Sequence, residues 1–109
     1  MYKCNIKERV LTMRYGLVEV HIRNDDLEIT YSDQKSLEDI VANIEKKYQI
    51  ISKKQYLPDT LRLSFKKTQN IKETYPWCLA MIDTKNYLLE QGWEPFLIEN
   101  EKYYFKKTI

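Results

Sequence analysis

One histidine and two cysteines are the side chains that could serve as a general base or a nucleophile at neutral pH. His21 alternates with Glu19 and Arg23 along the polar face of a predicted strand, so we expect an exposed sheet residue. Cys78 stands among apolar residues near a predicted helix start, which favours a buried structural thiol. Neither Cys78 nor Cys4 has a nearby second ligand of the kind that a zinc site needs. We therefore expect no catalytic residue, no metal ion and no cofactor.

The densest group of carboxylates is formed by Asp25, Asp26 and Glu28. Calcium-binding loops space their oxygen ligands over about twelve residues and need a glycine at a sharp turn. No glycine lies in this segment, so we expect a solvated hairpin turn. The chain has two glycines, Gly16 and Gly92, which is too few for a P-loop or a dinucleotide-binding fingerprint. The sequence thus predicts a protein that is not an enzyme.

The composition is that of an ordinary globular domain. The chain has 109 residues, of which 43% are hydrophobic, enough for a single core. The longest apolar run, over 77–82, is far shorter than the roughly 18 residues of a membrane span. The first nine residues contain no apolar stretch of signal-peptide length, and two distant cysteines do not predict a disulfide framework. We expect a soluble cytoplasmic protein that does not bind membranes.

The net charge of +2 is unevenly distributed. Residues 46–72 contain eight basic residues and one acidic residue, a local charge of +7, whereas residues 24–45 contain one basic and seven acidic residues. Blocks of this kind can mark a basic surface for a binding partner. They can also lie side by side in the fold and neutralise each other, and the sequence leaves both interpretations open.

Alternating apolar and polar residues predict a β-hairpin in the first third of the chain, over 17–23 and 27–31. A further strand over 8–14 would make the sheet seven-stranded instead of six-stranded. Four more strands are predicted in two pairs, 49–55 with 60–67 and 93–99 with 102–107.

A predicted helix precedes each of these strand pairs. Ser36, with Asp39 three positions later, predicts a capping box at the start of the first helix. The second helix starts at Pro76, because proline suits the first helical turn, and ends before Gly92.

A short repeat relates the two halves of this pattern. Phe65-Lys66-Lys67-Thr68 returns as Phe105-Lys106-Lys107-Thr108, and the predicted helix starts are also forty positions apart. This suggests two αββ units, 36–68 and 76–108, but the side chains between the matching points align poorly, so coincidence in a lysine-rich chain is favoured over a true duplication. In either case we predict a single two-layer α+β domain over 1–109, an antiparallel sheet of six or seven strands with two helices on one face.

The segment 88–94, followed by a hairpin that ends at 104–107, resembles the C-terminal part of certain small bacterial domains. It covers about a fifth of this chain. The resemblance implies no known activity.

The remaining candidates are surfaces for recognition. Nine tyrosines and two tryptophans are many for this length, and interfaces favour such residues; Tyr104 is the best candidate for an exposed aromatic. The predicted hairpin over residues 46–72 could carry Lys53, Arg62 and Lys66 on one face, with Lys54 and Lys67 at its edges. Our leading hypothesis is a small protein-interaction module, an adaptor, regulator or inhibitor.

The alternative is nucleic-acid binding through the basic hairpin, because lysine and arginine neutralise phosphates. A homodimer formed through a sheet edge is a further option. A deep cleft in which the single imidazole meets a thiol or several carboxylates would contradict the hypothesis of a binding surface.

Overall fold

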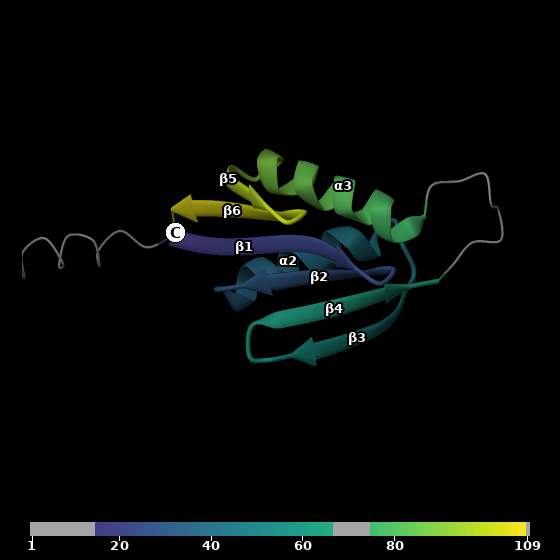
Figure 1. Ribbon diagram of the computed structural model, residues 1–109. Coiled ribbons are helices and arrows are strands. Elements are labelled where there is room, and N and C mark those ends of the chain that lie inside the picture. Colours follow the sequence, from purple (N-terminus) through teal and green to yellow (C-terminus); the bar gives the residue numbers. More distant parts are fainter. Residues whose placement is uncertain (1–14, 67–74, 109) are drawn as a thin grey trace, which may run out of the picture.

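In the computed structural model, residues 15–66 and 75–108 are described, and they form two layers (Figure 1). Six antiparallel strands make one sheet in the order β3-β4-β2-β1-β6-β5, and both helices pack on the same face of it. The predicted α+β class, with two helices on one face, is confirmed. The expected strand over 8–14 lies outside the described residues. The elements are β1 (Tyr15–Arg23), β2 (Asp26–Tyr31), α2 (Gln34–Glu45), β3 (Ile50–Tyr56), β4 (Thr60–Phe65), α3 (Pro76–Glu90), β5 (Glu94–Glu99) and β6 (Lys102–Thr108).

The hairpin β1–β2 lies at the centre of the sheet, and one αββ unit attaches to each of its strands. β4 pairs with β2, β6 pairs with β1, and β3 and β5 are the outer strands of the described sheet. Phe65 and Phe105, which open the repeated tetrapeptide, are both buried on the inner strands of their units. The predicted order of elements, a hairpin followed by αββ and αββ, is therefore present.

Apolar and polar residues alternate along both strands of the central hairpin, so the apolar side chains point toward the helices. Val18 and Val20 on β1, and Leu27 and Ile29 on β2, are exposed by 2% or less. Asn24 in the turn between them has a positive φ of 49°, a conformation that asparagine tolerates and that tight hairpin turns require. The residues of the turn and the alternation of apolar and polar residues in the strands therefore favour the same hairpin.

The helices close the core from one side. α2 begins two residues before the predicted start, because the side chain of Asp33 caps it and accepts a hydrogen bond from the Ser36 backbone N–H. The prediction of Ser36 as the capping residue was therefore wrong, whereas α3 starts at Pro76 as predicted. Among the described residues, no helix has the length and apolarity that crossing a membrane requires.

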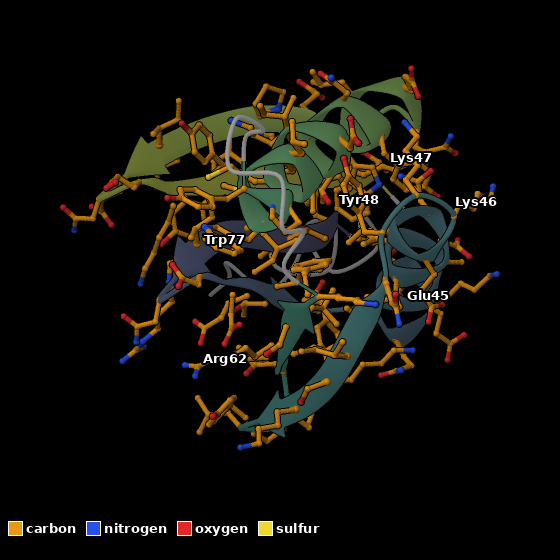
Figure 2. The ribbon with its side chains drawn as sticks, turned by 90° about the vertical axis from the view of Figure 1, so that its right-hand side faces the viewer. Glu45, Lys46, Lys47, Tyr48, Arg62 and Trp77 are labelled. Carbon is orange, nitrogen blue, oxygen red and sulfur yellow. The ribbon has the colours of Figure 1, made fainter. Side chains whose placement is uncertain are left out.

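A polar contact joins the end of α2 to α3. The hydroxyl of Tyr48, just after α2, donates a hydrogen bond to the Asp83 carboxylate of α3, and Lys47 Nζ lies 3.7 Å from the same carboxylate. Figure 2 shows Lys47 and Tyr48 together beside the end of α2. Burial, and then the hydrogen bond to Asp83, raise the pKa of the Tyr48 phenol.

Replacing Tyr48 by phenylalanine should lower the free energy of unfolding at pH 7 by about 1 kcal/mol, because Asp83 loses a hydrogen bond. The raised pKa keeps Tyr48 protonated in the folded protein where the unfolded chain, with a tyrosine pKa of about 10, already ionises. The contribution of Tyr48 is thus complete below about pH 10 and is lost as the pH rises further. Urea denaturation should show a constant difference between wild type and Tyr48→Phe up to about pH 10, and a difference that shrinks between about pH 10 and pH 11. A difference that stays constant over this range would contradict the role of the phenol.

Candidate functional site: the open face of the sheet

The side of the sheet opposite the helices, called the open face here, is not covered by any described element. Because side chains alternate along each strand, the pairing register collects polar residues on this side. Two cross-strand rows result. One contains Lys54, Arg62, Glu28 and His21, and the other contains Tyr56, Thr60, Thr30, Glu19, Tyr104 and Leu97.

Glu28 is the central residue of a charged network on the open face. Its side chain is buried, and Nε and Nη2 of Arg62 donate to Glu28 Oε2 at 2.9 and 2.7 Å. The guanidinium Cζ of Arg62 also lies 4.5 Å from the centre of the Tyr56 ring. The hydrogen bond to Glu28 raises the pKa of Arg62. Figure 2 shows Arg62 on the side of the sheet away from α2, as the alternation requires. We call Arg62, Glu28 and His21 the charged network.

His21 lies on the polar face, as predicted, but it is not an exposed residue. Its side chain is only 14% exposed and lies between two carboxylates, with Nε2 3.5 Å from Glu28 Oε1 and Nδ1 3.7 Å from Glu19 Oε2. Nδ1 is buried and has no hydrogen-bond partner. The expectation of exposure was wrong because the side chains of Glu19 and Glu28 lie on opposite sides of the ring.

The imidazole of His21 thus lies close to two carboxylates, but the three side chains do not lie in a deep cleft. The surrounding concavity, about 470 Å³ in volume, is shallow and open to solvent. Glu19 and Glu28 approach opposite nitrogens of His21 and do not converge on one reacting atom. The arrangement holds the ring in place.

The thiol of Cys78 lies on the other side of the sheet from His21. Cys78 is on α3, partly buried, and packs against the core near Ile22. The two side chains are therefore not brought together, and Cys4 lies outside the described residues. Within 15–66 and 75–108, no group of three or more His, Cys, Asp or Glu residues could hold a metal ion.

An apolar groove of about 570 Å³ opens beside the charged network. Its apolar wall contains Leu17 of β1, Phe96 of β5 and Tyr104 of β6, and Leu17 and Phe96 are 48% and 47% exposed. The rings of Phe96 and Tyr104 are tilted by 54°, with centroids 6.2 Å apart. A register shift between Pro95 and Leu97 brings Phe96 to this side. Tyr104 thus faces the open side as predicted, although it is partly buried.

The predicted basic face of the hairpin β3–β4 is not formed. A register shift between Ile50 and Ser52 inserts one residue into β3, so Lys54, and not Lys53, lies opposite Arg62. Lys53 points to the helix side, where its Nζ lies 2.8 Å from Glu45 Oε2 of α2. The prediction that Lys53 and Arg62 share a face was therefore wrong.

The other two lysines of the predicted surface have different outcomes. Lys66 is exposed just after β4. Lys67 lies outside the described residues. Since Glu28 binds Arg62 and Glu45 binds Lys53, the hairpin offers less free positive charge than its composition predicts.

Tyr104 of the groove wall was singled out from the sequence, but Leu17 and Phe96 were not. Leu17 was predicted only as the first residue of an alternating strand, and 95–98 only as part of the strand over 93–99. The signal was present in β5, whose apolar run does not alternate with polar residues. Successive side chains of a strand point to opposite faces, so a run of consecutive apolar residues in an edge strand places apolar side chains on both faces of the sheet.

The comparisons with known proteins give no relative: no family model matches the sequence, and neither curated proteins nor solved structures match it. The role of the open face must therefore follow from its geometry.

Replacing Arg62 by methionine should lower the urea midpoint of unfolding, because it leaves the buried Glu28 carboxylate next to His21 without its cation. Adding Glu28→Gln to this variant should recover part of the loss, since the uncompensated charge is then removed. Equal midpoints for the single and the double variant would show that Glu28 does not depend on Arg62.

Proposed function

We propose that this protein is a small, non-enzymatic protein-interaction module of the cytoplasm, which acts as an adaptor, regulator or inhibitor and binds another protein with the open face of its sheet. The apolar groove is the observation that carries this proposal. Leu17 and Phe96, which line it, are 48% and 47% exposed. Apolar side chains gathered in one patch and bordered by polar groups are typical of a surface that binds another macromolecule.

The charged network lies next to the groove and also supports the proposal. The groove and the concavity around His21 share Glu19, Thr30 and Asp59, so together they form one continuous depression. A partner would find apolar contact at one end and oriented polar groups at the other. Aromatic anchors such as Phe96 and Tyr104 supply much of the affinity in interfaces of this composition.

Charged substitutions in the groove test the proposal. We expect Leu17→Asp and Phe96→Asp to abolish the recovery of one particular protein when the purified chain is used as bait in a lysate of its source organism. Ile82→Asp and Leu89→Asp are the controls, because both residues are 49% exposed but lie on α3. Quantitative mass spectrometry should find the same protein with wild type and with both controls. Equal recovery with the groove variants would refute the open face as the binding surface.

Nucleic-acid binding through residues 46–72 is the alternative, and it has less support. Lys53 and Arg62 are already bound to carboxylates, which leaves Lys54 and Lys66 as exposed cations of the described hairpin. We expect no retention of DNA or RNA in filter binding at low salt. Retention that falls steeply with rising salt, and that falls further in Lys54→Gln and Lys66→Gln, would favour this alternative.

Self-association through a sheet edge also has less support. If β5 paired antiparallel with its own copy, Glu94 would lie opposite Glu99, and β3 would place Lys53 opposite itself; like charges in these positions are destabilising. We therefore expect light scattering to give the mass of a monomer at all concentrations tested. A mass that rises with concentration would show that one of these edges, or another surface, associates.

A further inference from the structure

Glu19 is a carboxylate whose neighbours on both adjacent strands are uncharged. Its side chain is 18% exposed, and the register places it between Thr30 of β2 and Tyr104 of β6. Burial, and then the charge of Glu19 and a hydrogen bond to it, raise the pKa of the Tyr104 phenol, which donates to this carboxylate. Glu28, in contrast, lies opposite Arg62. Glu19 therefore has no lysine or arginine directly opposite it on either adjacent strand, and His21, with Nδ1 3.7 Å from Glu19 Oε2, lies on its own strand.

The groove next to Glu19 is acidic at one end. Asp59, from the turn between β3 and β4, lines it together with Glu19, and among the described lining residues there is no lysine, arginine or histidine. Lys106 lies beyond the other end, one cross-strand pair further along, where its Nζ is 5.6 Å from the centre of the Phe96 ring and 5.9 Å from that of Tyr15. The groove thus combines an apolar end with a carboxylate end.

We infer that the partner is a protein whose binding segment places a lysine or arginine against Glu19 and an adjacent aliphatic or aromatic side chain in the apolar groove. This inference rests on the function proposed above and adds the chemistry of the partner. A cation at this position would form charge-assisted hydrogen bonds with Glu19. It would also lie beside the ring of Tyr104, which is directly opposite Glu19 and whose face attracts cations. An acidic segment or a nucleic acid would instead bring negative charge to Glu19 and Asp59.

A selection from random peptides tests this chemistry without knowledge of the natural partner. The probe is a phage-displayed library of random 12-residue peptides, selected on the wild-type chain after depletion on Leu17→Asp. We expect the enriched peptides to contain lysine or arginine within two positions of leucine, isoleucine, phenylalanine or tryptophan. Enrichment of peptides without a basic residue would overturn the inference.

The affinities of one enriched peptide then test the role of Glu19. In fluorescence anisotropy, Glu19→Gln should weaken binding roughly tenfold or more, as expected for the loss of one charge-assisted contact. Glu99→Gln is the matched control, because Glu99 is on the same face but pairs with Lys102 of β6, and it should leave the affinity unchanged. Replacing the basic residue of the peptide by glutamine should abolish the difference between wild type and Glu19→Gln.

The outcomes separate this inference from the proposed function. If no peptide depends on Leu17, both the groove and the inference drawn from it fail. If peptides depend on Leu17 but bind Glu19→Gln as tightly as wild type, the groove remains a binding surface and the cationic partner is refuted.

Discussion

The structure depends on one constraint, the alternation of side chains in the central hairpin β1–β2. Val20, Leu27 and Ile29 are fully buried beneath the helices, and their sequence neighbours consequently face the other way. A shift of the pairing register by one residue would turn this apolar set to solvent, which fixes the register strongly. Since β4 and β6 pair with the same hairpin, the constraint also determines which residues of the outer units reach the open face.

The same alternation of side chains brings the residues of the charged network together on the open face. A carboxylate as buried as Glu28 is tolerated in a protein when a cation and hydrogen bonds compensate it, and Arg62 supplies both from the neighbouring strand. Glu28 of the network contacts one nitrogen of His21, and Glu19, at the edge of the depression, contacts the other. An ordered polar floor beside an exposed apolar wall is well suited to recognition, because few side chains need to be fixed when a partner binds.

Most of the fold could be predicted from the sequence, and the candidate site could be predicted only in part. Periods of two and of 3.6 residues, a proline at a helix start and residues that favour turns gave the class, the order of elements and the side of the sheet on which Tyr104 lies. These features are local. The error over Lys53 has a non-local cause, because the extra residue in β3 is visible only once β4 is paired with it.

The same limit applies to the open face. The sequence placed His21 correctly on the polar side, but its burial depends on Glu19 and Glu28, and the position of Glu28 beside it depends on how two strands pair. The groove is harder still to predict from the sequence, since Leu17 and Phe96 lie on β1 and β5, which are far apart in the sequence. The polar side of a strand can therefore be predicted from its sequence, whereas the residues that meet on that side depend on the pairing of the whole sheet.

The pairing of β1 with β6 has a consequence for biosynthesis. The first described strand forms hydrogen bonds with the last one, so the described sheet cannot be completed until β6 has left the ribosome. The hairpin, α2, β3 and β4 can assemble earlier, since the pairings of β1 with β2, β2 with β4 and β3 with β4 lie within one continuous segment. During translation, this intermediate would expose the unpaired edge of β1, including the backbone beside Leu17 and Glu19, until the hairpin β5–β6 has been synthesised and covers that edge.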